Sequence, residues 1–294
     1  MIVGLANPIS GIAHMLGHPF LRYAFLGGTG IALASGLVGY FVVLRGQVFT
    51  GDALSHVAFT GALAALALGA DLRVGLYGAC VVFAVIMAVL GGRSGADDTV
   101  VGSVFAWVLG LGALFLTVYT TSSSGVNATT GVNVLFGSIF GLSGGAALTD
   151  ALVSLAVVSA VVVIARPLVF STVDEAVASA RGVPSRGLGF VFLVLVGVTA
   201  GEASQAVGAL LLLGLLAAPA GAAQLLTARP FRALWLSAGI AVLSVWVGLS
   251  IAYAAPQVPP SFGILAVATS CYVLAAIGVY GRRLVAKSKH QLPA

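Results

Sequence analysis

Residues 233–254 read ALWLSAGIAVLSVWVGLSIAYA, a stretch without a single charged side chain. A helix needs about 20 mostly apolar residues to cross the hydrocarbon core of a bilayer. The rest of the sequence is similar, because 60% of its 294 residues are hydrophobic and only 7% are charged, whereas a soluble protein carries roughly 25% charged residues. The apolar runs lack two-residue alternation, which favours helices over a barrel. We therefore expect an all-α polytopic transmembrane bundle.

The apolar runs predict eight or nine spans in a single domain over residues 1–294. We expect a membrane-embedded core at 21–281 and a basic tail at 282–294. The nine expected spans are 22–44, 52–70, 73–91, 99–120, 149–165, 187–201, 205–227, 232–254 and 262–280. We also expect a short interfacial helix around Val134 to Gly141.

The basic residues predict the orientation of the bundle. Eleven of the 13 lysine and arginine residues lie in loops that follow odd-numbered spans. The positive-inside rule places these loops and the C-terminus in the cytoplasm, and the N-terminus outside. We expect a multi-pass protein of the cell membrane. The net charge of +5 then reflects topology, and no nucleic-acid partner is expected.

Residues 171–184, STVDEAVASARGVP, predict a short helix in a cytoplasmic loop. Thr172 and Glu175 match a capping box, Asp174 favours the positive end of the helix dipole, and Arg181 and Gly182 are typical of a helix end. A helix of about two turns is marginal when isolated. The residues leave two interpretations open: a helix lying on its own bundle, or a helix that docks on a partner ATPase.

An ionisable side chain inside a span costs at least about 2.5 kcal/mol and is usually retained for a task. Asp52 and His56 lie four residues apart, on one face of the second span. A carboxylate and a neutral imidazole are a common ligand pair for Zn²⁺ or Mn²⁺. Alternatively, Asp52 is an N-cap and His56 bonds to a neighbouring carbonyl group.

The remaining polar candidates have simpler interpretations. Glu202 is expected as a solvated turn residue between spans six and seven, with a weaker alternative as a metal-attracting acid. Other acids are expected at helix starts or in a loop, where capping and the dipole explain them, and two histidines on an exposed interfacial helix. These are Asp97, Asp98 and Asp150 at helix starts, Asp71 in a loop, and His14 and His18.

The sequence does not favour an enzyme. It has no HExxH motif, and both lysines lie in the C-terminal tail, so no phosphate-binding loop is present. Ser55 adjoins His56, but neighbouring residues on a helix point in different directions. Cys80 and Cys271 lie in different spans and predict neither a disulfide framework nor a zinc-thiolate cluster. Any ATPase must be a separate polypeptide.

Four stretches resemble the permease subunits of zinc and manganese ABC importers, over about residues 20–280. They are LRGQ at 44–47 with GDALSH at 51–56, LFGSI at 135–139, VDE to GVP across 173–184, and VGALL to LAAPA across 207–220. The family's Asp-x-Pro-Ser-Gly appears as VPPSFG at 258–263 and its Asp-Pro-Glu as VDE at 173–175. These departures indicate a divergent branch, such as the anchored-repeat type, whose substrate need not be zinc or manganese.

This resemblance implies a permease subunit that imports Zn²⁺ or Mn²⁺ as its substrate, without a permanently bound cofactor. The implied partners are a cytoplasmic ATP-binding subunit, an extracytoplasmic metal-binding protein, a second copy of the chain and the lipid bilayer. Asp52 and His56 would contact the metal or gate its path. The residues implied to couple to the ATPase are Asp174, Glu175, Ala178, Arg181 and Gly182. Two other functions remain open: a permease for a chelated metal such as haem or a siderophore, and a secondary transporter that needs no ATPase.

Overall fold

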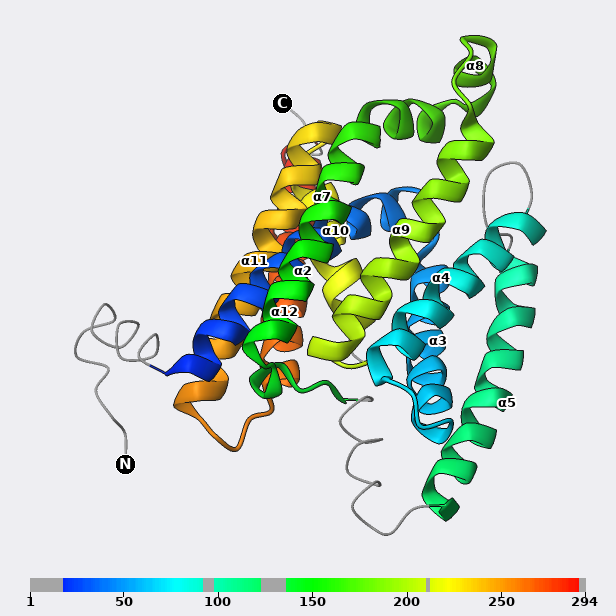
Figure 1. The fold of residues 1–294 in the computed structure, drawn as a ribbon. Helices are drawn as coiled ribbons and strands as arrows, with labels where there is room; N and C mark the ends of the chain where they lie inside the picture. Colours follow the sequence, from blue (N-terminus) through cyan, green and yellow to red (C-terminus); the bar gives the residue numbers. More distant parts are fainter. Residues whose placement is uncertain (1–17, 92–97, 123–135, 210–211, 291–294) are drawn as a thin grey trace.

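The computed structural model describes residues 18–91, 98–122, 136–209 and 212–290, and within these ranges it contains helices and no β-strand. Figure 1 shows the helices in chain order. They are α2 (Pro19–Leu44), α3 (Val48–Ala67), α4 (Leu72–Leu90), α5 (Asp98–Ser122), the 3₁₀ turn η1 (Ile139–Gly141), α7 (Gly144–Val173), α8 (Glu175–Ala180), α9 (Ser185–Ala206), α10 (Leu212–Leu226), α11 (Pro230–Ala254) and α12 (Pro260–His290).

The expected helical membrane bundle is confirmed, with a helix at each of the nine expected spans. Seven of the described helices are long and apolar enough to cross a membrane. The other two are α3, in which Asp52 and His56 lower the hydropathy, and α10, which has only 15 residues. The chain is thus a multi-pass membrane protein in which α3 and α10 depend on their neighbours for burial.

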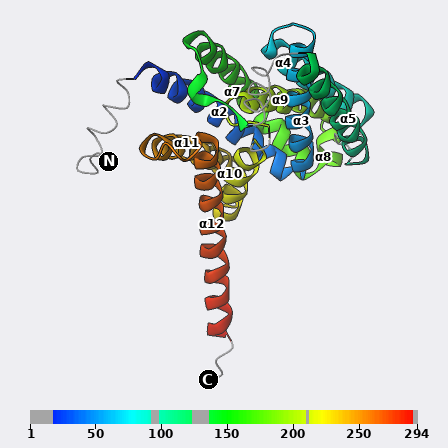
Figure 2. The same ribbon diagram turned by 90° about the horizontal axis from the view of Figure 1, so that it is seen from below.

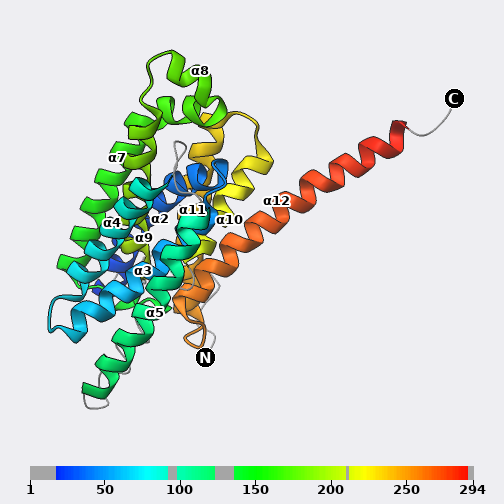
Figure 3. The ribbon, with the colours of Figure 1, turned by 90° about the vertical axis from the view of Figure 1, so that its right-hand side faces the viewer.

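Helix α2 lies at the centre of the bundle. Of its most apolar 18-residue window 72% is buried, against 17% for the corresponding windows of α5 and α12 at the periphery. Helices α7, α9, α10 and α11 pack around α2, while α3, α4 and α5 form a second group that meets the first through α9. Helix α12 contacts α10 and α11 and then projects away from the rest (Figures 2 and 3).

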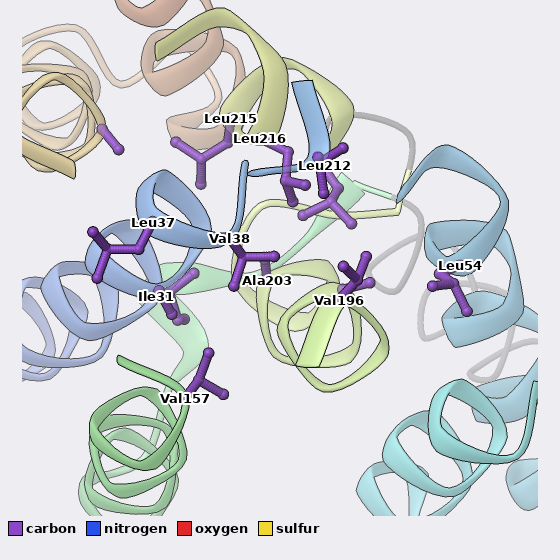
Figure 4. Packing of buried hydrophobic residues seen from close by; sticks show 14 of the residues in the cluster. Ile31, Leu37, Val38, Leu54, Val157, Val196, Ala203, Leu212, Leu215 and Leu216 are labelled. Carbon is purple, nitrogen blue, oxygen red and sulfur yellow. The ribbon is translucent and has the colours of Figure 1, made fainter. Parts of the chain in front are cut away.

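The core lies where the two groups meet. Figure 4 shows the buried side chain of Val38 in α2 beside Ala203 of α9, and Ile31 of α2 near Val157 of α7. Small residues let the backbones approach closely within the second group. A methyl group on Gly61 of α3 would overlap the backbone of Gly75 in α4, and the reverse is also true. Close packing of small residues is how helices associate in lipid, where hydrophobic burial offers little.

Helix α7 and the helix expected at 134–141 differ from their predicted extents. Helix α7 extends well beyond the expected span 149–165 at both ends. Ser143 caps its N-terminus by accepting a hydrogen bond from the Ala146 N–H at 3.2 Å, and the helix continues through Pro167. Its 30 residues are more than the about 20 needed to span hydrocarbon. The helix therefore continues past the expected span 149–165 at its C-terminal end. Of the expected helix at 134–141, the structure has η1 at 139–141, and residues 134 and 135 lie outside the described ranges.

Candidate functional site

Asp52 and His56 both lie on α3, as the sequence predicts. Helix α3 begins at Val48, so Asp52 occupies its second turn, and the alternative in which Asp52 is an N-cap is wrong. Both side chains are partly exposed, whereas the intervening residues Ala53, Leu54 and Ser55 are buried. The carboxylate and the imidazole thus share one accessible helix face and are positioned four residues apart, where side chains on a helix are neighbours.

One side of this helix face is covered by α5. The ring of His56 packs edge-on against Phe105, with centroids 5.2 Å apart, and Phe105 also contacts Phe49 at 5.7 Å. About one turn after His56 in α3, the Thr60 hydroxyl donates a 3.2 Å hydrogen bond to the carbonyl oxygen of Val108. These contacts hold α5 against α3 and limit the ways in which the imidazole can turn.

Asp52 and His56 supply two ligand atoms, one hard oxygen and one borderline nitrogen, which suit Mn²⁺ or Zn²⁺. Over the described ranges, the structure has no group of three or more His, Cys, Asp or Glu side chains that could hold a metal ion. Protein sites for Zn²⁺ usually supply three or four ligands. The pair is therefore an incomplete site for tight binding, which fits an ion in passage better than a resident one.

Glu202 lies elsewhere, and its expected place in a solvated turn is wrong. Helix α9 continues to Ala206, so Glu202 is inside the helix, with 0% of its surface exposed. The Ser154 hydroxyl of α7 donates a short hydrogen bond to its Oε1 atom, while Oε2 has no hydrogen-bond partner among the described residues. Glu202 does not join Asp52 and His56 in a three-ligand group.

Asp150 also differs from expectation. It lies in the second turn of α7 rather than at its start, and only 1% of its surface is exposed. Arg73, in the first turn of α4, approaches it with 3.7 Å between Nη2 and Oδ1. A sequence signal for these buried polar groups does exist. Arg73 and Tyr77 are four residues apart, as are Asp150 and Ser154, within otherwise apolar helices. That spacing places each pair on one helix face.

The short loop helix is confirmed as α8, with a different N-terminus. Asp174 is the N-cap and accepts a 2.9 Å hydrogen bond from the Val177 N–H, whereas Thr172 belongs to α7 and donates to the Leu168 carbonyl oxygen. The expected capping box between Thr172 and Glu175 is therefore wrong. Asp174 is the N-cap of α8 because α7 continues to Val173 and Asp174 is the first residue after it with an extended backbone.

The C-terminus of α8 has the expected ending. Arg181 is the C-cap, and Gly182 follows with a φ of +80°, a value that favours glycine. The N–H groups of Gly182 and Val183 donate 3.0 Å hydrogen bonds to the carbonyl oxygens of Ser179 and Ala178, respectively. This pair of bonds is a Schellman motif. It gives a six-residue helix a fixed shape although it has few turns of its own.

Helix α8 has a buried side and an exposed side. Ala178 is fully buried where α8 packs against α7 and α9. Asp174, Arg181 and Gly182 are exposed, and Glu175 is half-buried. Val173 and Val177 are apolar yet 75% and 42% exposed. Figures 1 and 3 show that α8 protrudes at one end of the bundle, so these apolar side chains are open to a partner.

Arg45 lies in the turn before α3 and packs on α9. Its guanidinium lies over the ring of Phe192, 5.4 Å from the centroid. Burial lowers the pKa of Arg45, and the negative charge of Glu175 opposes this shift. Arg45, three residues before α3, therefore lies within electrostatic range of Glu175, the first residue of α8.

The other polar candidates cap helices, lie in first turns or pack against aromatic rings. Asp71 is the N-cap of α4 and accepts a 2.8 Å hydrogen bond from the Arg73 N–H, Asp98 lies in the first turn of α5, and His18 precedes α2 and packs near Phe20 and Tyr253. His14 and Asp97 lie outside the described residues. Cys80 is buried, Cys271 is partly exposed, and both are free thiols.

Comparison with known proteins finds similar sequences and structures among membrane transport proteins. The manganese transport system membrane protein MntC of Halalkalibacterium halodurans is 28% identical over 264 residues, which cover 89% of this chain and 88% of that protein. The solved structure of PsaBC from Streptococcus pneumoniae in complex with Fab superposes with a TM-score of 0.78 at 25% identity, covering 92% of this chain and 95% of that one.

A second solved structure, an inward-facing putative metal-chelate type ABC transporter, has a TM-score of 0.63 at 18% identity and covers 95% of this chain and 91% of that one; it shares the fold. The family model described as the ABC 3 transport family matches residues 17–278. This match includes α2 to α11, Asp52, His56 and α8, and the chain therefore belongs to the ABC 3 transport family.

Proposed function

We propose that this chain is the membrane permease subunit of an ABC importer of divalent metal ions, with Mn²⁺ as the substrate and Zn²⁺ as its closest competitor. The family match over residues 17–278 carries the proposal. The similarity to a manganese transport protein along nearly the full length of both chains supports the choice of metal. The carboxylate of Asp52 and the imidazole of His56 are ligands that both ions accept.

The proposed path runs past the accessible face of α3. Asp52 and His56 bind the ion weakly, because two ligands leave most of its coordination sphere to water or to a second copy of the chain. Conduction requires binding that is favourable enough for entry and weak enough for release. A homodimer with α3 of each copy facing the path would bring two such pairs together, and the dimer is part of the proposal.

The proposed energy source is a separate cytoplasmic ATP-binding subunit that docks on α8. The exposed Val173 and Val177 offer apolar contacts, and the charged side chains of Asp174 and Arg181 are exposed in the same segment. A metal-binding protein on the other side of the membrane delivers the ion. In this arrangement the C-terminus lies in the cytoplasm, in agreement with the basic residues of the tail and with the position of the end of α12 toward the same end of the bundle as α8 (Figure 3).

Manganese uptake into liposomes containing the assembled transporter tests the proposal. We expect Asp52→Ala and His56→Ala to abolish uptake of radioactive manganese while the complex still assembles. Asp98→Ala and His18→Ala are matched controls, because they remove the same chemical groups from the first turn of α5 and from the residue before α2 and leave the Asp52–His56 pair intact. Normal uptake by Asp52→Ala would contradict the site.

Two other results would redirect the proposal. Uptake of manganese by this chain without any ATPase would indicate a secondary transporter. Uptake of a metal chelate that is unaffected by Asp52→Ala, without uptake of the free ion, would indicate a chelate permease.

A further inference from the structure

Six polar side chains gather near the first turns of α4 and α7 and the last turns of α9. We name this set the three-helix polar cluster: Arg73, Tyr77, Asp150, Ser154, Glu202 and Gln205. Glu202 and Asp150 are 0% and 1% exposed, although both belong to helices of membrane-spanning length. Charged groups at such positions are rare and usually serve a function. The transport path proposed above, which runs past Asp52 and His56, leaves this cluster unused.

Contacts within the cluster join each pair of the three helices α4, α7 and α9. The Ser154 hydroxyl donates to Glu202, which joins α7 to α9. Arg73 of α4 forms the 3.7 Å ion pair with Asp150 and donates a 2.7 Å hydrogen bond to the Thr149 hydroxyl, both on α7. With the Gln205 amide oxygen facing Arg73, that oxygen accepts hydrogen bonds of 2.8 and 3.1 Å from the guanidinium, which joins α4 to α9.

The cluster and α8 connect α7 and α9 at opposite ends of the two helices. Helix α8 joins α7 and α9 at their cytoplasmic ends, between Val173 and Ser185. Ser154 lies 19 residues before Val173, which at 1.5 Å per residue is about 30 Å away. The two helices are therefore tied together at both ends, by α8 at one end and by Ser154 and Glu202 at the other.

The cluster also reaches α3, the helix of Asp52 and His56. Gly201, which precedes Glu202, faces α4 so closely that a methyl group there would lie 3.2 Å from the Tyr77 ring and 3.6 Å from the sulfur of Cys80. The Cys80 thiol in turn contacts the carbonyl oxygen of Leu54 at 3.5 Å, and Leu54 lies between Asp52 and His56 in α3. A continuous series of contacts therefore leads from α8 to the candidate metal ligands.

We infer that the three-helix polar cluster transmits the motion of α8 to α3, with Glu202 as a positioning residue whose bond to Ser154 keeps α7 and α9 moving together. This inference rests on the proposed function. Glu202 binds no metal in this role. Loss of the bond leaves Arg73 as the remaining polar link between α7 and α9 at this end. ATP hydrolysis then continues while α3 follows the motion of α8 less closely.

The test measures ATP hydrolysed per manganese ion delivered into liposomes by the assembled transporter. We expect Ser154→Ala and Glu202→Ala to raise this ratio about two- to thirtyfold, the range typical of residues that modulate coupling. Glu202→Gln retains an oxygen that accepts the Ser154 bond and should keep a ratio near that of the unchanged protein. The double variant Ser154→Ala/Glu202→Ala should be no worse than Glu202→Ala alone, because both changes remove the same bond.

Ser237→Ala is the matched control. Ser237 is also fully buried and donates a 2.7 Å hydrogen bond between helices, from α11 to Gly36 of α2, but it is outside the series of contacts that leads to α3. It should leave the ratio unchanged. Uptake and hydrolysis that fall in proportion in Ser154→Ala, or an equal rise of the ratio in Ser237→Ala, would overturn the inference. Failure of the unchanged protein to transport metal would instead overturn the proposed function.

If Glu202→Ala fails to assemble, Ser154→Ala decides the question, because it removes only one oxygen atom. A raised ratio in Ser154→Ala together with a normal ratio in Glu202→Gln supports the role of the bond. A normal ratio in Ser154→Ala contradicts it.

Discussion

The choice between metals depends on single ligand atoms of α3. Imidazole nitrogen favours Zn²⁺ over Mn²⁺ more strongly than carboxylate oxygen does. We therefore predict that His56→Asp, which replaces nitrogen by oxygen at the same helix position, weakens inhibition of manganese uptake by zinc. The zinc concentration for half-inhibition should rise at least about tenfold, which corresponds to about 1.4 kcal/mol.

Competition assays over a range of zinc concentrations measure this effect. His18→Asp is the control, since His18 precedes α2 and contacts aromatic rings instead of α3. An unchanged half-inhibitory concentration in His56→Asp would mean that zinc is not held by this imidazole.

The residues also differ in how well the sequence predicts them. Asp52 and His56 belong to one helix, so their common face follows from local spacing alone. Glu202 and Asp150 depend on helix boundaries and on distant partners. A sixth span that ends at residue 201 makes Glu202 a turn residue, whereas α9 continues to Ala206. Its partner Ser154 lies 48 residues away in the sequence, a separation that helix periodicity does not reach.

Pairs of helices depend on close backbone approach where small residues meet. Gly61 of α3 and Gly75 of α4 leave no space for a side chain, because a methyl group on either would overlap the other's backbone. We predict that Gly61→Ala lowers the stability of the protein by about 1–3 kcal/mol, the usual cost of overpacking. The same change should disturb metal uptake, since α3 carries Asp52 and His56.

Thermal unfolding of the purified protein in detergent measures the loss. Gly78→Ala is the matched control, because Gly78 also lies in a membrane helix but has no atom within 4 Å of an added methyl group. It should be neutral or slightly stabilising, as alanine is the better helix former. Equal unfolding temperatures for the two variants would show that α3 and α4 can separate without cost.

Individual elements were predictable where their signals are local. The Schellman ending of α8 follows from Arg181 and Gly182, whose roles depend on adjacent residues only. The start of α8 was not predictable in the same way, because it depends on how far α7 extends. Arg166 and Pro167 are typical of a helix end in an isolated sequence. In the folded protein, packing of α7 against α2 and α9 carries the helix past both residues.

At the scale of the whole molecule, composition predicts a helical membrane protein, but it does not predict which helices are central and which are peripheral. The central position of α2 and the peripheral positions of α5 and α12 (Figure 2) arise from contacts between distant spans. All three are apolar helices of similar hydropathy. Hydropathy alone therefore does not distinguish a buried helix from a lipid-facing one, since both environments are apolar.

The orientation of the bundle is the whole-molecule property that the proposed mechanism needs most, since α8 must face the cytoplasmic ATPase. In a background carrying Cys80→Ala and Cys271→Ala, we predict that Val177→Cys on α8 is labelled by a membrane-impermeant maleimide only after the cells are opened. Ala70→Cys, in the exposed turn between α3 and α4, should be labelled in intact cells because the basic residues place that turn outside. The two variants serve as each other's control for reagent access. Labelling of Val177→Cys in intact cells would reverse the orientation and remove α8 as the docking site for an ATPase.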